Sequence, residues 1–122
     1  MKPDEDPLEK RLPAVVLTEG YCGKFLLVGV TVGERRLVLL RSGDLWHREI
    51  LRSAEAEIRA LGLSEARIGE LGGAHLSFEP DGAILIWGGS DEFGACDHRY
   101  AAALLQTVWP GRRITCIPGE IP

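Results

Sequence analysis

The segment 44–61 most constrains the fold, because its apolar side chains recur at the three- and four-residue spacing of an amphipathic helix. Asp44 precedes this stripe and can accept hydrogen bonds from the free N–H groups of a first helical turn, and Gly62 follows it and favours termination. We therefore expect a helix from about 44 to 61 that turns one face toward the body of the protein. The stripe consists of His47, Ile50, Leu51, Ala54, Ile58 and Leu61.

His47 is the unusual member of the stripe, because it is the only titratable side chain on that face. An imidazole with an unperturbed pKa near ~6.5 exchanges protons at cellular pH. At this position it can transfer a proton or face a phosphate group. The alternative is a core histidine whose two ring nitrogens are both hydrogen-bonded inside the protein.

The apolar runs and turn residues in the rest of the sequence predict an α+β domain. Strands are expected where apolar runs are bounded by turn residues, such as the Glu-Pro-Asp-Gly turn at 79–82. The expected strands are 14–18, 24–32, 35–40, 67–78, 83–87 and 113–117, and a second helix is expected at 94–108 with Cys96, Tyr100, Ala103, Leu104 and Val108 inward. Because the strands are grouped around the helices rather than alternating strictly with them, we expect a mixed six-stranded sheet with two helices packed on it.

Composition favours one domain and excludes two classes of partner. At 122 residues, 45% hydrophobic and 26% charged, the chain is ordinary for one globular core. Residues 1–13 are charged and proline-punctuated, which predicts a flexible N-terminal tail before a single domain at 14–122.

The net charge of -4 and the scattered arginines argue against nucleic acid as a partner. No apolar run approaches the ~20 residues of a membrane span, and the first residues lack the pattern of a secretory signal. We expect a cytoplasmic monomer.

The cysteines indicate neither a disulfide scaffold nor a metal site. Cys22, Cys96 and Cys116 are odd in number and widely spaced. Cys96, Asp97 and His98 are adjacent, and adjacent helical side chains point about 100° apart, so they cannot converge on one ion. We expect no metal and no cofactor.

Two glycine clusters are candidate functional features. Gly72 and Gly73 lie within a strand pattern, which marks either a bulge or a place where another group approaches the backbone closely. Gly88, Gly89 and Ser90 lie between a strand and the second helix, where free N–H groups can form an anion-binding concavity. Turn geometry alone is the alternative for this second cluster. The chain has neither a P-loop nor a dinucleotide fingerprint.

Four segments together resemble the janus/ocnus family, whose best-known members are phosphohistidine phosphatases. The matching segments are Gly23–Val28, Trp46–Ile50, Leu71–Ser77 and Ile86–Gly94, and the resemblance runs from about residue 20 to residue 116. It implies a compact α+β fold and metal-independent hydrolysis of phosphohistidine in proteins or peptides. It also implies that His47 is the catalytic histidine, acting as a general base or as a phosphoryl acceptor.

The resemblance further implies a substrate-binding set. Backbone N–H groups near His47 and at 90–92 would hold the phosphate, Lys24 matches a basic residue of the family, and Arg41 lies near another. The expected substrate- and phosphate-binding residues are Lys24, Arg41, Trp46, Gly73, His75, Ser90, Asp91 and Glu92.

Two positions depart from the family pattern. His75 stands where the phosphatases have an arginine, which removes a permanent charge and a bidentate donor. Glu92 stands where they have a small residue, next to Asp91; these carboxylates either favour the start of the second helix or face the pocket and repel a phosphate dianion. His75 and Glu92 favour an alternative, a non-catalytic module that binds phosphorylated or basic peptides. A further alternative is a structural or partner-binding domain.

Overall fold

The computed structural model describes residues 8–117 and confirms the α+β class, but the count of elements differs from expectation. The sheet has five strands instead of six, and there are three helices instead of two in the described part of the chain. None of these helices is long and apolar enough to cross a membrane. In chain order the elements are α1 (Leu8–Arg11), β1 (Cys22–Val32), β2 (Arg35–Gly43), α2 (His47–Ala60), β3 (Arg67–Phe78), β4 (Ile84–Trp87), α3 (His98–Val108) and β5 (Ile114–Cys116).

The missing strand and the extra helix both lie near the N-terminus. The segment 14–18 makes only an isolated bridge between Val15 and Leu40, with one hydrogen bond on either side of it, so it does not extend the sheet. The four-residue helix α1 was missed because so short a run shows no helical period. It lies in the expected tail, yet Leu12 next to it is 1% exposed and packs in the core. Residues 1–7 of that expected tail lie outside the described residues.

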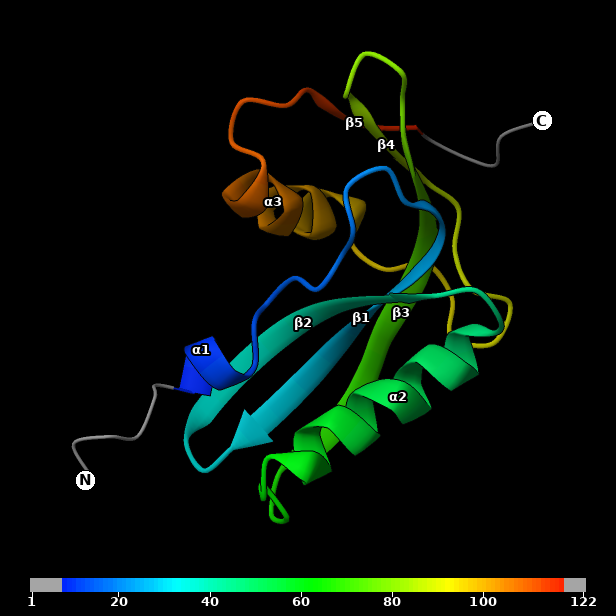
Figure 1. Ribbon diagram of the computed structural model, residues 1–122. Coiled ribbons are helices and arrows are strands. Elements are labelled where there is room, and N and C mark those ends of the chain that lie inside the picture. The colour runs from blue at the N-terminus through cyan, green and yellow to red at the C-terminus, as the bar shows by residue number, and fades with distance from the viewer. Residues whose placement is uncertain (1–7, 118–122) are drawn as a thin grey trace.

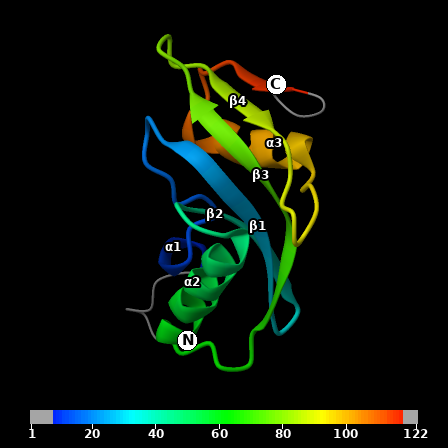
Figure 2. The ribbon, with the colours of Figure 1, turned by 90° about the vertical axis from the view of Figure 1, so that its right-hand side faces the viewer.

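The strands form one twisted sheet in the order β2-β1-β3-β4-β5 (Figure 1). Every neighbouring pair is antiparallel except β4 and β5, which are parallel. Alternate residues of β1 belong to different core clusters: Phe25 and Leu27 pack with α3, whereas Leu26 and Val28 pack with α2. The two long helices therefore cover opposite faces of the sheet, as Figure 2 shows.

Helix α2 confirms the apolar stripe but not its expected cap. His47, Ile50, Ala54 and Ile58 are buried, and Gly62 follows the helix in the left-handed region at φ +80°. The cap assigned to Asp44 is wrong, because the helix begins at His47 and its N-cap is Trp46, which supplies no side-chain acceptor. Strand β2 continues to residue 43, so residues 44–46 are used to turn the chain from the sheet into the helix.

Helix α3 begins four residues later than expected, and its buried face is different. Asp97 caps it by accepting a hydrogen bond from the Tyr100 N–H at 3.1 Å. The buried residues of the helix are Ala101 and Leu105, whereas Tyr100 is 46% exposed. The inward face assigned to residues 100, 103 and 108 is wrong, because residues 91–95 form turns and bridges that shift the start of the helical repeat.

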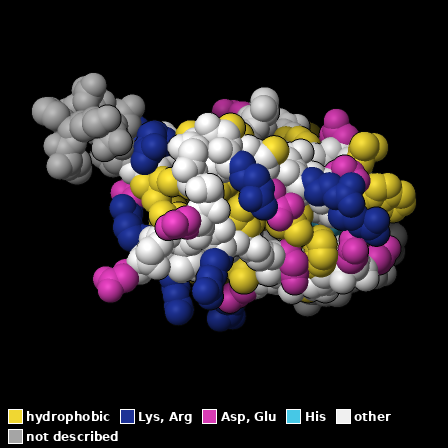
Figure 3. Space-filling model, turned by 90° about the horizontal axis from the view of Figure 1, so that it is seen from below, with side chains coloured by type: hydrophobic (Ala, Val, Ile, Leu, Met, Phe, Trp, Pro, Cys, Tyr) yellow, Lys and Arg dark blue, Asp and Glu magenta, His cyan; other side chains and the backbone are white. Residues whose placement is uncertain are grey.

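Charged side chains of both signs are interspersed on the face of the molecule seen in Figure 3. Lys and Arg do not gather there into the stripe that a nucleic-acid backbone requires.

Candidate functional site

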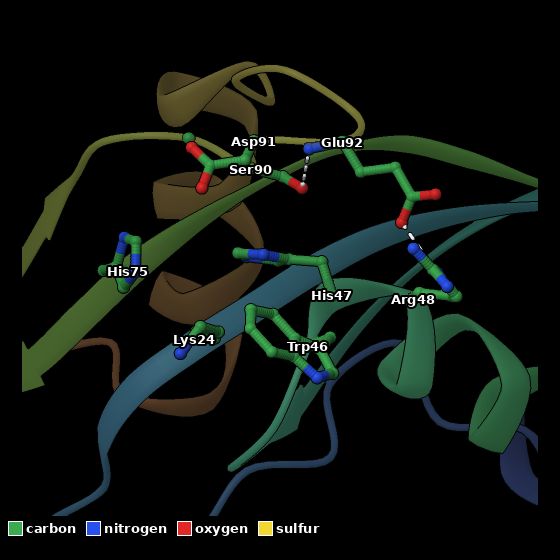
Figure 4. Close-up of a pocket in the computed structure, with 9 residues that line it drawn as sticks. Lys24, Trp46, His47, Arg48, His75, Ser90, Asp91 and Glu92 are labelled. Atoms are coloured by element: carbon green, nitrogen blue, oxygen red, sulfur yellow. Dashed lines mark hydrogen bonds and ion pairs between the residues drawn. The ribbon is translucent and has the colours of Figure 1, made fainter.

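A cavity of about 280 Å³ lies where the first turn of α2 meets β1, β3 and the loop 88–94 (Figure 4). It brings together every site residue expected from the sequence except Arg41 and Gly73. The lining residues are Lys24, Trp46, His47, Arg48, His75, Gly89, Ser90, Asp91 and Glu92.

His47 is held in a defined orientation at the first position of α2. The residue is 6% exposed, and its Nε2 lies 3.2 Å from the carbonyl oxygen of Ala74. Because a carbonyl oxygen only accepts, Nε2 carries the hydrogen of the neutral ring and Nδ1 carries the free electron pair. In residues 8–117, Nδ1 has no hydrogen-bond partner and it is not sealed from solvent. His47 is therefore not a core histidine with both nitrogens satisfied.

The double glycine of β3 shapes the strand beneath this ring, and Gly73 provides the space for it. Gly72 has φ +89° and lies at a register shift in the β1–β3 pairing, so it forms the expected bulge. Gly73 is the expected close approach, because a Cβ there would lie 2.6 Å from Nε2 of His47. Its own N–H donates to the Gly94 carbonyl at 3.0 Å, so it is not free to bind phosphate. Gly73 positions His47 instead of contacting a ligand in the cavity.

His75 is a second imidazole of the pocket, and it lies opposite Lys24 in the β1–β3 pairing. Its ring stacks on Trp87 and meets His47 edge to face, with 5.8 Å between ring centroids in each case. Burial lowers its pKa, and the nearby His47 and Lys24 lower it further, whereas Asp91 acts in the opposite direction. The Nδ1 of His75 is buried without a partner in the described residues, so the proton of the neutral ring belongs on Nε2.

The loop 88–94 offers fewer anion-binding donors than its glycines suggested. Ser90 Oγ accepts hydrogen bonds from the N–H groups of Glu92 at 3.3 Å and Phe93 at 3.1 Å. The N–H of Ser90 donates to the Gly94 carbonyl, and that of Gly94 donates back to the Ser90 carbonyl. Within the described part of the chain, the N–H groups of Gly88, Gly89 and Asp91 have no internal acceptor, and of these residues Gly89 and Asp91 line the pocket.

An ion pair crosses the rim of the pocket. Arg48 Nε lies 3.1 Å from Glu92 Oε1, and both side chains are exposed to solvent. Asp97, and not Glu92, caps α3, so Glu92 does not favour the start of that helix in the expected way. Glu92 lines the pocket instead, and its charge is paired with that of Arg48. The sequence reasoning missed Arg48, although its place directly after His47 in a first helical turn was a usable signal.

Arg41 lies outside the pocket, and its predicted place in the substrate-binding set is not supported. It is 5% exposed, and its guanidinium makes two contacts of 2.8 Å with the Glu57 carboxylate. It also donates to the carbonyl oxygens of Pro13 at 2.8 Å and Leu40 at 3.0 Å. These contacts occupy its donors and tie the N-terminal segment and β2 to α2.

Two of the three free cysteines, Cys96 and Cys116, are at least partly shielded from solvent, and Cys22 is exposed. Burial raises the pKa of Cys96 to about 12 and also raises that of Cys116, so both remain thiols at neutral pH. Residues 8–117 contain no group of three or more His, Cys, Asp or Glu side chains placed to hold a metal ion.

Comparison with known proteins bears on the family but not on the chemistry. No protein with a curated description matches the sequence. The sequence model of the Janus/Ocnus family matches residues 9–113, which is most of the chain and includes every residue of the pocket. The chain therefore belongs to the Janus/Ocnus family.

Proposed function

We propose that this protein hydrolyses phosphohistidine in proteins or peptides without a metal ion, with His47 as general base or phosphoryl acceptor. The observation that carries the proposal is the orientation of His47: Nε2 lies 3.2 Å from the Ala74 carbonyl oxygen, and in the described residues Nδ1 has no hydrogen-bond partner and is not sealed from solvent beside the pocket. A base held in this way loses little freedom when it meets a substrate. General-base catalysis typically supplies about 10²–10⁴-fold in rate.

In the general-base route, a water molecule attacks the phosphorus atom. The water oxygen bonds to phosphorus, one of its protons passes to Nδ1 of His47, and the electron pair of the P–N bond goes to the substrate ring. A ring that carries a proton on its other nitrogen leaves as neutral imidazole. The carbonyl of Ala74, which accepts from Nε2, stabilises the imidazolium form of His47 that results.

In the acceptor route, Nδ1 of His47 attacks phosphorus itself. The substrate P–N bond breaks toward the substrate ring, and water then cleaves the new P–N bond on His47. The two routes differ in one measurable respect, since only the second forms a phosphorylated protein. Acid-labile, alkali-stable phosphate trapped on His47 after rapid quenching identifies the acceptor route.

The groups that would hold the phosphoryl oxygens come from three parts of the fold. Lys24 supplies a positive charge from β1, and the accessible Nε2–H of His75 supplies a neutral donor from β3. The N–H groups at the start of α2 receive no side-chain acceptor from Trp46. Together with the N–H of Asp91, these donors would stabilise the negative charge that is spread over the phosphoryl oxygens. Stabilising that charge is the main requirement of phosphoryl transfer.

A non-catalytic module that binds phosphorylated or basic peptides is the second candidate. The observation that favours it is the charge balance of the pocket, where Asp91 and Glu92 offset Lys24 and Arg48. A neutral rim attracts a phosphate dianion less strongly than the basic rim of a dedicated anion site.

Phosphate release from a phosphohistidine peptide separates these candidates. His47→Asn is expected to abolish turnover, whereas His98→Asn is the matched control. Like His47, His98 is the first residue of a helix and has its Nε2 close to a carbonyl oxygen, here that of Gly88 at 2.7 Å. Unlike His47, His98 does not line the pocket. If the wild-type protein binds the peptide but releases no phosphate, the binding module replaces the phosphatase.

A further inference from the structure

Asp91 and Lys24 are the two charged side chains of the pocket that make no ion pair within residues 8–117. Figure 4 shows them on opposite sides of the pocket, with the rings of His47 and His75 between them. The other two charges, those of Arg48 and Glu92, offset each other across the rim. A ligand between the two histidines therefore meets a free cation on one side and a free carboxylate on the other.

The carboxylate of Asp91 acts on the interior of this pocket. It opposes the lowering of the His75 pKa, so its negative charge favours a protonated imidazole at that position. The Asp91 carboxylate would lower the affinity of the pocket for inorganic phosphate or a phosphate ester, because the carboxylate and the phosphate are both negatively charged and repel each other. A ligand with a phosphoryl group bonded directly to a cationic ring satisfies both Lys24 and Asp91.

We propose that Asp91 accepts a hydrogen bond from the protonated imidazole ring of phosphohistidine, and so selects N-phosphoryl over O-phosphoryl substrates. This inference rests on the proposed function and names the residue that distinguishes the substrate class. Phosphoserine, phosphothreonine and phosphotyrosine have no cationic ring and offer Asp91 no donor.

The same contact assists the reaction. In phosphohistidine one ring nitrogen bears the phosphoryl group, and the other nitrogen binds a proton near neutral pH. A carboxylate beside that second N–H favours the protonated form, which breaks its P–N bond more readily. The electron pair of the P–N bond then goes to the ring, which departs as neutral imidazole, while the attacking water loses its proton to Nδ1 of His47. Asp91 remains ionised throughout and transfers no proton.

Asp91→Asn tests the proposal, with Asp97→Asn as the matched control. Asparagine at 97 can still cap α3, and residue 97 is outside the pocket. For each protein, kcat/KM on a phosphohistidine peptide is measured from about pH 6 to about pH 9, where the substrate ring loses its proton. The inhibition constant of a phosphotyrosine peptide of the same sequence is measured alongside. Other charges facing Asp91 come from His47, His75, Lys24 and the Arg48–Glu92 pair, and all of them stay in both variants.

The expected result is a loss of about ten-fold or more in kcat/KM at the alkaline end, as for a lost charge-assisted hydrogen bond, and a smaller loss at the acidic end. The phosphotyrosine peptide should bind equally well or more tightly. A kcat/KM equal to or above wild type at every pH overturns the proposal, because the carboxylate then only repels. A parallel loss for both peptides also overturns it. A wild-type protein that releases no phosphate shows instead that the proposed function itself fails.

Discussion

His47 packs directly over Gly73, and no other amino acid fits at position 73 without moving the imidazole. A Cβ on Gly73 would lie 2.6 Å from Nε2 of His47, on the same nitrogen that bonds the Ala74 carbonyl. The strand thus holds the ring by two means, the absence of a side chain at 73 and the acceptor at 74. The orientation of the candidate base is a property of β3 as much as of α2.

Gly73→Ala should therefore remove turnover of a phosphohistidine peptide and destabilise the fold by about 1–3 kcal/mol, the range for overpacking a filled site. Gly69→Ala is the control, because a Cβ at this other glycine of β3 meets no atom within 4 Å. It should change the free energy of unfolding by no more than about 0.5 kcal/mol and keep full turnover. Urea unfolding and phosphate release measure both effects. If Gly73→Ala keeps wild-type turnover, the position of His47 does not depend on the space at residue 73.

Part of this site could be predicted from the sequence, because local patterns carried it. The helical spacing around His47 predicted its burial. The double glycine predicted either a bulge or a close approach, and the structure has a bulge at 72 and a close approach at 73. What stayed open was which group approaches Gly73. That contact joins residues 26 positions apart in the chain, and no local pattern specifies such a pairing.

The predictions for the buried face of α3 and for Arg41 were wrong because tertiary packing overrode a local pattern. The inward face of α3 depends on where the helix begins, and the loop that delays it to His98 is held by hydrogen bonds between Ser90 and Gly94 that the sequence does not reveal. Arg41 was assigned to the pocket because it is basic and near a family position. Its Glu57 partner lies on a different element, so spacing could not indicate the pair.

His75 should titrate below the usual range of histidine, since burial is the largest of the effects that lower its pKa. NMR titration of the ring protons measures this directly. Asp91→Asn should lower the His75 midpoint further, and Lys24→Gln should raise it, because the two charges act in opposite directions. A His75 midpoint at or above about 6.5 would contradict the burial of its Nδ1.

The same shift makes stability depend on pH with a definite sign. The folded state disfavours the charged ring, so the unfolded chain binds more protons as the pH falls from about 6.5 toward the folded pKa. Neutral His75 contributes its full stability above about pH 6.5, and this contribution is lost as the pH falls from about 6.5 to the pKa of His75 in the folded protein. His75→Gln should therefore lose less stability than wild type between about pH 7.5 and about pH 5.5, measured by urea unfolding. An equal loss in both proteins would show that other groups govern the acid sensitivity.

Glu92→Gln should strengthen the binding of inorganic phosphate, because it releases the Arg48 guanidinium from its ion pair and removes one negative charge from the rim. The gain should be largest at low ionic strength, where charges on the surface are least screened. Arg48→Gln should weaken phosphate binding by about 1–3 kcal/mol. Arg52→Gln is the control, since Arg52 lies one turn further along α2, pairs with Glu49 and does not line the pocket. Calorimetric titration with phosphate that shows no difference among the three variants would place the anion elsewhere.

Arg41→Gln should cost stability without changing the affinity for phosphate. Removing the guanidinium leaves the Glu57 carboxylate without its two 2.8 Å partners. It also removes the donor to the Pro13 carbonyl oxygen, whereas the Leu40 carbonyl oxygen keeps the hydrogen bond from the Val16 N–H. Breaking one side of a buried pair costs about 3–5 kcal/mol, and the partial exposure of Glu57 places the expected loss near the lower end of that range. The double variant Arg41→Gln with Glu57→Gln should recover part of the loss, because no uncompensated charge then remains. Urea unfolding gives the free energies, and phosphate titration of the folded variants gives the affinity. Weaker phosphate binding by a folded Arg41→Gln protein would return Arg41 to the substrate-binding set.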